Sequence, residues 1–151
     1  MIFSDAAGPL SWFAELSVSG RSWSEQMARE MSNGYPRALT EDEHDLIEAL
    51  LGGARSGAVR FVGQLEGAEV VGGCRCGCPS IDLSISDKPI DGRPRPLVLA
   101  DGESPEGVPV GVILWVCDRV LSGLEVHPWD GSNVVRLPRP ETLCNIRAGR
   151  D

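Results

Sequence analysis

The sequence has no long apolar run, and this absence excludes a membrane-spanning helix. Its longest candidate stretch, from Val108 to Val116, is far shorter than the roughly 20 residues that a helix needs to cross a bilayer. The N-terminus also lacks the cationic and apolar regions of a secretory signal. We therefore expect a cytoplasmic protein that makes no contact with a membrane.

Basic residues are scarce as well. The chain has 14 Lys and Arg against 22 Asp and Glu, which gives a net charge of -8 at pH 7. Proteins that bind nucleic acids gather Lys and Arg around phosphates, so we expect no nucleic-acid partner. A basic protein is the better match, because complementary charge speeds encounter and favours specificity.

Residues that act as general bases are few. The only histidines are His44 and His127, and a Ser or Cys nucleophile needs such a base beside it. We expect His44 to be solvated in the first turn of a helix, and His127 to lie opposite Val112 and turned away from Cys117. The chain also lacks the G-x-S-x-G motif and the glycine spacing of nucleotide-binding loops. These absences favour a protein that is not an enzyme, and they leave thiol chemistry open.

The length and composition that remain are those of one globular domain. The chain has 151 residues, of which 42% are hydrophobic and 24% are charged. We expect residues 1–36 to be an N-terminal extension with a short helix beginning near Ser22. Residues 37–140 should form a single α+β domain, followed by a C-terminal tail at residues 141–151.

Helical patterns come first in the expected domain. Residues 40–43 form a capping box, and an apolar stripe from Leu46 to Leu51 follows it before Gly52 and Gly53 end the helix. Residues 58–65 keep the spacing of a second helical stretch.

Strand patterns begin after Gly67. Residues 81–85 alternate between apolar and polar, residues 110–116 are apolar on both faces, and residues 121–126 can fold back on them through a turn. We expect Asp118 and Arg119 to form that turn. The sequence thus predicts an α+β fold with two or three N-terminal helices packed on one face of a mostly antiparallel sheet of four to six strands.

Three finer expectations concern the later part of the chain. We pair Ile113 with Val126 and Trp115 with Leu124 on one face of the hairpin. Residues 87–109, rich in proline, glycine and acids, should be a long exposed connection that includes a candidate short strand at residues 97–99. Residues 133–137 are a candidate last strand.

Three of the five cysteines, Cys74, Cys76 and Cys78, stand at alternate positions. In an extended strand their sulfur atoms would lie about 7 Å apart on one side, too far for one tetrahedral ion unless the backbone curls. Gly77 and Pro79 are residues that permit such a curl.

These cysteines admit three interpretations. They can pack as small buried hydrophobic residues, or one can be a reactive thiol activated by Arg75. They can also hold zinc, with a fourth ligand drawn from one of four residues further along the chain. Those four are Asp82, Cys117, His127 and Cys144.

Acidic residues cluster at the start of the helix predicted from the capping box at residues 40–43. Glu41, Asp42, Glu43, Asp45 and Glu48 are most simply a solvated helix face. The alternative is an acidic docking surface that covers a basic site, such as that of a toxin nuclease.

Three short segments, residues 39–51, 76–83 and 121–126, resemble a group of small uncharacterised bacterial α+β proteins. The resemblance covers about residues 37–140 and implies no established activity, cofactor or site residue. Proteins of this general kind include immunity proteins that neutralise toxins.

The sequence therefore leads to two hypotheses of different classes. The first is a small acidic, non-enzymatic binding protein of the immunity type, without a cofactor, that contacts a basic partner. Its contact residues would be Glu41, Asp42, Glu43 and Asp45. The second is a zinc–thiolate module or a thiol-dependent enzyme centred on Cys74, Cys76 and Cys78. Neither hypothesis predicts an oligomeric state.

Overall fold

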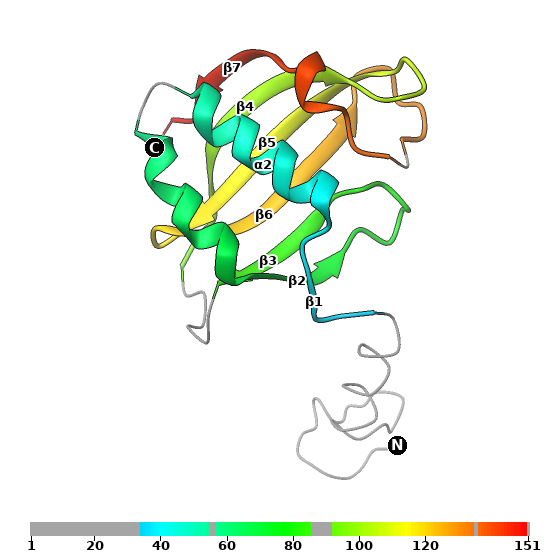
Figure 1. The fold of residues 1–151 in the computed structure, drawn as a ribbon. Helices are drawn as coiled ribbons and strands as arrows, with labels where there is room; N and C mark the ends of the chain where they lie inside the picture. Colours follow the sequence, from blue (N-terminus) through cyan, green and yellow to red (C-terminus); the bar gives the residue numbers. More distant parts are fainter. Residues whose placement is uncertain (1–33, 55–56, 86–91, 135, 151) are drawn as a thin grey trace, which may run out of the picture. The chain divides into compact units, whose positions relative to one another are not determined.

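A computed structural model describes residues 34–54, 57–85, 92–134 and 136–150 (Figure 1). The chain divides into two compact units, Met1–Tyr35 and Pro36–Asp151, and the fold below is that of the second. The helix expected near Ser22 lies outside the described residues. In the part of the chain that the structure describes, no helix is long and apolar enough to cross a membrane.

Helix α2 (Glu41–Gly53) forms as predicted from its capping box. The Thr40 hydroxyl accepts the Glu43 N–H at 3.2 Å, and the Glu43 carboxylate accepts the Thr40 N–H at 2.8 Å. These two bonds satisfy donors that a helix start leaves free. The predicted stripe from Leu46 to Leu51 supplies four fully buried side chains, at positions 46, 47, 50 and 51.

The second helical stretch is confirmed in place but is a 3₁₀ helix, η1 (Ala58–Gly67). It starts after Gly57, whose φ of 76° is in the left-handed region that glycine adopts readily. Ala58, Phe61 and Leu65 are its buried residues. The β-branched and glycine residues of this segment have low α-helical propensity, consistent with the different helix type.

Seven strands form one sheet in the described residues, in the order β1-β2-β3-β6-β5-β4-β7, and every neighbouring pair is antiparallel. The strands are β1 (Arg37–Ala38), β2 (Ala68–Gly73), β3 (Ile81–Ile85), β4 (Arg95–Glu103), β5 (Pro109–Cys117), β6 (Val120–Pro128) and β7 (Cys144–Ala148). Helices α2 and η1 lie across the same face of the sheet (Figure 1). The predicted α+β class is confirmed, and the sheet is larger than the four to six strands expected.

The connection predicted at residues 87–109 is largely wrong, because β4 occupies much of it, although the candidate short strand at residues 97–99 lies within β4. This strand has nine residues, from Arg95 to Glu103, and eight of them pair with residues of β5. Pro96 is accommodated near the strand start, where the register shifts between Pro96 and Val98. Proline, glycine and acidic residues on the exposed parts of β4 concealed a strand whose Val98 and Ala100 are buried.

The end of the domain also differs from the prediction. The described residues of the segment 133–137 form no strand. The expected tail at 141–151 instead contains β7, which pairs with β4 at one edge of the sheet and follows the short 3₁₀ helix η2 (Pro140–Thr142). Ile146 of β7 packs so closely on α2 that a Cβ atom on Gly53 would meet its Cδ1 at 2.5 Å. The tail is therefore part of the fold.

The predicted hairpin of β5 and β6 forms through the expected turn, but its register was wrong by one residue. Val112 pairs with Val126 and Leu114 with Leu124, so it is the even-numbered residues of β5 that face the helices. A slip of one residue exchanges the two faces of a strand. Ile113 consequently lies half-buried on the opposite face.

Two local features fix this register. Asp118 and Arg119 have φ values of 50° and 66°, a two-residue turn of the primed type that sets Cys117 opposite Val120. An irregularity after Trp115 then shifts the pairing by one residue. As a consequence, His127 is paired with Gly111 and not with Val112.

Candidate functional site

The three alternate cysteines lie on the connection between β2 and β3, which we call the trithiol loop (Cys74–Ser80). The Cys74 N–H donates to the Ser80 carbonyl at 3.2 Å and closes the loop. Inside it, the Gly77 N–H donates to the Cys74 carbonyl at 3.4 Å, and Gly77 has a φ of 91°. Of the two conformations considered from the sequence, the loop therefore adopts the curled one, with the backbone turning at Gly77, and not an extended strand.

The curl brings the three sulfur atoms together. The Sγ atoms of Cys74, Cys76 and Cys78 all lie within 4.8 Å of one another. Cys74 Sγ and Cys76 Sγ are 2.7 Å apart, and the Cys78 N–H donates to Cys76 Sγ at 3.4 Å. An extended strand would have kept alternate sulfurs about 7 Å apart. The sequence could not show this convergence. It only indicated, through Gly77 and Pro79, that the backbone of this segment can curl.

The interpretation of these cysteines as buried packing residues is also wrong. Cys74 and Cys76 are exposed, and Cys78 is half-buried. Cys117 by contrast is buried in the core, and fits the usual role of a cysteine as a small hydrophobic residue. The trithiol loop thus presents free thiols to solvent.

Ser80 fastens the trithiol loop to the sheet. Its hydroxyl accepts the Val126 N–H at 2.9 Å and donates to the Val126 carbonyl at 3.3 Å. The same hydroxyl accepts a hydrogen bond from the Cys78 thiol at 3.3 Å. The position of Cys78 therefore depends on the contact between Ser80 and Val126, which lie 46 positions apart in the chain.

The neighbouring thiols have different acidities. Burial raises the pKa of Cys78, but hydrogen bonds with Ser80 and Cys76 outweigh it and lower that pKa to about 7. Hydrogen bonds with Cys74 and Cys78 raise the pKa of Cys76 to about 11. The sequence pointed to Arg75 as the activating group, whereas the lowering comes from Ser80 and Cys76.

None of the four residues proposed as a fourth zinc ligand joins the cluster in the part of the chain that the structure describes. Cys117 is buried in β5, and Cys144 lies on β7, at an edge of the sheet. The His127 ring packs edge-on against Trp129, with ring centres 4.9 Å apart, and covers Gly111. The site consists of three sulfur atoms on one loop.

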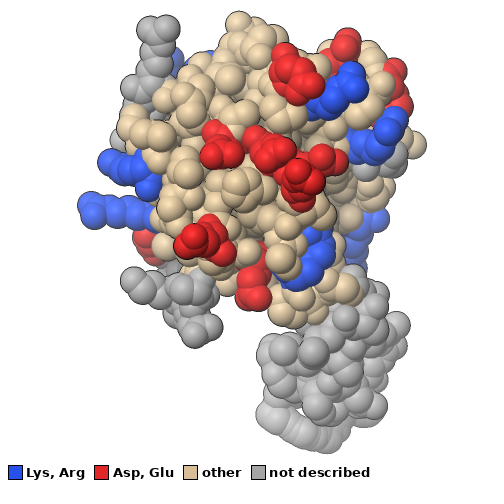
Figure 2. Space-filling model, in the orientation of Figure 1, with Lys and Arg blue, Asp and Glu red and all other residues tan. Residues whose placement is uncertain are grey.

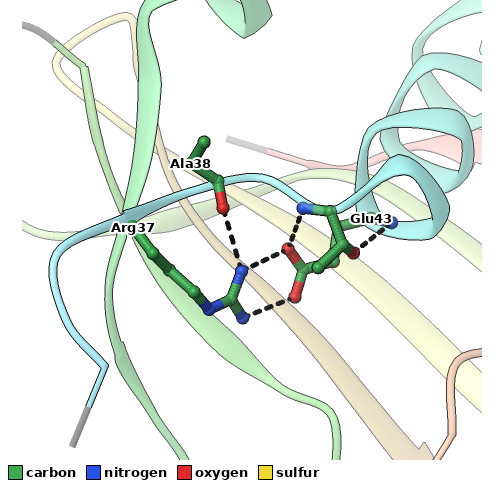
Figure 3. Close-up of polar contacts among 4 residues, drawn as sticks. Arg37, Ala38 and Glu43 are labelled. Carbon is green, nitrogen blue, oxygen red and sulfur yellow. Dashed lines mark hydrogen bonds and ion pairs between the residues drawn. The ribbon is translucent and has the colours of Figure 1, made fainter.

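The acidic residues of α2 differ in burial, because Glu43 is buried and the other four are exposed. Glu43 is only 6% exposed, and its carboxylate accepts two N–H bonds from Arg37, at 2.8 and 2.9 Å, besides the bond from Thr40 (Figure 3). Glu43 is therefore not a contact residue for a partner, contrary to the sequence-based hypothesis. Burial raises the pKa of Glu43, but the hydrogen bonds and charge of Arg37 outweigh it and the net shift is downward.

The remaining acids of the cluster are exposed. Figure 2 shows acidic side chains gathered over α2, and those of the cluster are Glu41, Asp42, Asp45 and Glu48. We call these four residues the acidic surface. His44 Nδ1 lies 3.8 Å from Asp45 and 3.9 Å from Glu48, on the same exposed side of the helix. These contacts are long and solvated, and they contribute little to stability.

An open hollow of about 470 Å³ lies beside the β5–β6 turn, lined by Arg60, Phe61, Gln64 and Arg119. The Gln64 side chain donates to the Arg119 carbonyl at 2.8 Å and accepts the Leu121 N–H at 2.9 Å. Sequence reasoning missed this role of Gln64, because the partners lie more than 50 positions away. Its function in the described structure is to hold η1 against the turn.

Comparisons of the chain with protein-family models, with curated proteins and with solved structures found no match. The resemblance to small bacterial α+β proteins therefore stays a prediction, and any functional argument depends on the site itself.

Proposed function

We propose that this protein binds a thiophilic metal ion at the trithiol loop, through Cys74, Cys76 and Cys78. The observation that carries this proposal is the convergence of three sulfur atoms within 4.8 Å of one another, on two exposed cysteines and one half-buried cysteine. A metal–sulfur bond of about 2.3 Å in tetrahedral geometry separates two sulfur ligands by about 3.8 Å. The 4.8 Å limit of the cluster includes that separation, and the Cys74 and Cys76 sulfur atoms, 2.7 Å apart, have to move apart by about 1 Å to reach it.

The surroundings of the sulfur atoms support the same function. Thiolate groups select soft or borderline ions, such as zinc, over magnesium or calcium. An ion can reach the loop from solvent, because Cys74 and Cys76 are exposed. The attachment of Ser80 to Val126 holds the loop on the sheet before the ion arrives, which lowers the entropy cost of binding.

Equilibrium dialysis of the reduced full chain against zinc tests the proposal. We expect one ion per chain, and none in the variant in which Cys74, Cys76 and Cys78 are all replaced by Ser. The matched control is Cys144→Ser, which removes an exposed cysteine from β7 and should bind as the wild type does. A triple variant that still binds zinc as tightly as the wild type does would refute the site.

The acidic surface supports a second candidate function, a non-enzymatic contact with a basic protein, as in the immunity hypothesis. The observation that favours it is the exposure of four carboxylates along one side of α2, with the long His44 contacts as their only ion pairs among the described residues. Glu43 takes no part, because it is buried against Arg37. Exposed carboxylates of this kind raise the association rate with a cationic partner.

Association rates with basic bacterial nuclease toxins, measured at several salt concentrations, test this second function. The test variant changes Glu41, Asp42 and Asp45 to their amides. The control changes Glu66, Glu69 and Glu125 to glutamine, which removes the same charge from exposed residues outside α2. A slower association with the test variant alone supports the acidic surface. Equal rates for both variants would contradict it.

A further inference from the structure

We infer that the ion held by the trithiol loop is monovalent copper in three-coordinate thiolate geometry. This inference rests on the proposed function and concerns which ion fits the site. It is drawn from the number of ligands, from their spacing and from the exposure of the loop.

The number of ligands is the first argument. The sulfur atoms of Cys74, Cys76 and Cys78 lie within 4.8 Å of one another, and no other His, Cys, Asp or Glu among the described residues has a ligand atom in this cluster. The nearby hydroxyl of Ser80 is already engaged with both backbone groups of Val126. Structural zinc sites almost always have four protein ligands, and iron–sulfur clusters also take four. Three thiolates are an incomplete set for either.

The spacing of the ligands is the second argument. Common zinc modules use C-x-x-C pairs, whereas this loop has C-x-C-x-C. Its central sulfur, Cys76, lies 2.7 Å from Cys74 Sγ and accepts the Cys78 N–H. All three donors thus come from five consecutive residues on one side of an ion. Three thiolates from one short loop match an ion that needs only three soft ligands. Monovalent copper is such an ion, because it prefers thiolate ligands.

Exposure is the third argument. Three thiolates around a monovalent ion leave a doubly negative site, which would be costly in the core. The loop lies at the surface, where water screens this charge. Arg75, an exposed cation, lies between the first two ligands in the sequence. Zinc catalytic sites also have three protein ligands, but they combine these with a bound water in a cleft. The described residues form no such enclosure around the thiols, since two of the three are exposed.

The test uses the reduced full chain without oxygen, loaded separately with one equivalent of Cu(I) or of Zn(II). Each sample is challenged with a chelator for its ion, and the sulfur coordination number is measured by X-ray absorption. We expect copper to be retained with three sulfur ligands and zinc to be removed by a weak chelator. Cys78→Ser should reduce the sulfur number to two and weaken copper binding by roughly tenfold or more, whereas Cys144→Ser should change neither.

The outcomes separate this inference from the proposed function. Tight retention of one zinc ion, lost in the triple serine variant, would overturn the copper assignment and leave the metal site intact. Copper bound by two sulfur atoms in the wild type would also overturn the three-coordinate assignment. Failure of both ions to bind would refute the metal site itself.

Discussion

The first turn of α2 is rich in acidic residues and the trithiol loop is rich in cysteines, but the fold arranges the two sets of side chains differently. The first turn of α2 disperses its acids, because successive helical residues point in different directions: Glu43 faces inward, whereas Glu41 and Asp42 are exposed. The trithiol loop collects its thiols, because the backbone reverses at Gly77. Side chains of one kind therefore converge on a single point only where the backbone reverses, whereas the helix leaves its exposed acids spread along one side.

The two segments also differ in what they contribute to the fold. The inward carboxylate of Glu43 joins Arg37, Thr40 and the helix start into one hydrogen-bonded unit. The thiols lie at the surface and bury little area. We therefore expect substitutions in the first segment to affect stability and substitutions in the second to affect ligand binding.

The largest effect is expected for Glu43→Gln. This change removes the charge that two Arg37 bonds require and weakens the cap, so the free energy of unfolding should fall by about 2–3 kcal/mol in urea titrations at pH 7. The control Glu41→Gln, in the same turn but exposed, should cost about 0.5 kcal/mol through the helix dipole. Equal costs for the two variants would show that the inward carboxylate has no special role.

The stability difference between the wild type and Glu43→Gln should also depend on pH. The pKa of Glu43 is lowered below 4.5 in the folded state, so its contribution to stability is complete above 4.5 and is lost as the pH falls through the folded pKa. The gap in unfolding free energy between wild type and Glu43→Gln should therefore narrow below pH 4.5. A gap that stays constant from pH 7 to pH 3 would contradict the assignment.

The next effect concerns the trithiol loop with its ion. At a free ion concentration of one hundred times Kd, binding should raise the unfolding free energy of the wild type by about 2.7 kcal/mol. The triple serine variant should gain nothing, and without metal it should unfold within about 0.5 kcal/mol of the wild type, because exposed side chains carry little stability. Thermal and urea unfolding with and without zinc measure both values. A triple variant that unfolds readily without metal would mean that the thiols serve the fold.

A smaller effect is expected for Gly77→Ala. No described atom lies within 4 Å of the added Cβ, but alanine at a φ of 91° is strained by about 1–2 kcal/mol. The loop should relax from its curl, and metal affinity should fall about tenfold while the sheet stays folded. Gly52→Ala is the control, because Gly52 is exposed in α2 and also has open space. Unchanged affinity in Gly77→Ala would show that the curl is not needed.

The smallest effect, a shift in reactivity, separates the thiols of the metal-free chain. The rate of alkylation of Cys78 should rise with a midpoint near pH 7, whereas Cys76 should require a pH near 11. Ser80→Ala should raise the Cys78 midpoint, because it removes the hydroxyl that can turn from the Val126 carbonyl and donate to the Cys78 thiolate. Mass spectrometry of peptides alkylated at several pH values gives both midpoints. A midpoint for Cys78 that Ser80→Ala leaves unchanged would remove Ser80 as the cause.

Local patterns in the sequence predicted the elements that local physics determines. The capping box and stripe of α2, the alternation of β3 and the turn at Asp118 and Arg119 each lie within a few residues, and each formed in place. Edge strands β1 and β7 were missed because they are short and mostly exposed. The register of the central hairpin was missed because it depends on one irregularity after Trp115.

The candidate site was only half predictable for the same reason. The sequence identified Cys74, Cys76 and Cys78 as a group, and it named Gly77 as a residue that permits a curl. It could not reveal the bond between Ser80 and Val126 that fixes the loop, since this contact spans 46 positions. Nor did it identify Arg37 as the partner that turns Glu43 inward.

Convergence of the three sulfur atoms is the central claim, and trivalent arsenic tests it most directly. Arsenite condenses with three thiols, forming three arsenic–sulfur bonds and releasing three water molecules, so it requires sulfurs that can meet at one atom. Intact-mass measurement of the reduced full chain should show one arsenic atom per chain, unchanged in Cys144→Ser and absent when Cys74, Cys76 and Cys78 are serine. A wild-type chain that forms no such adduct, or a triple variant that still forms it, would contradict the account.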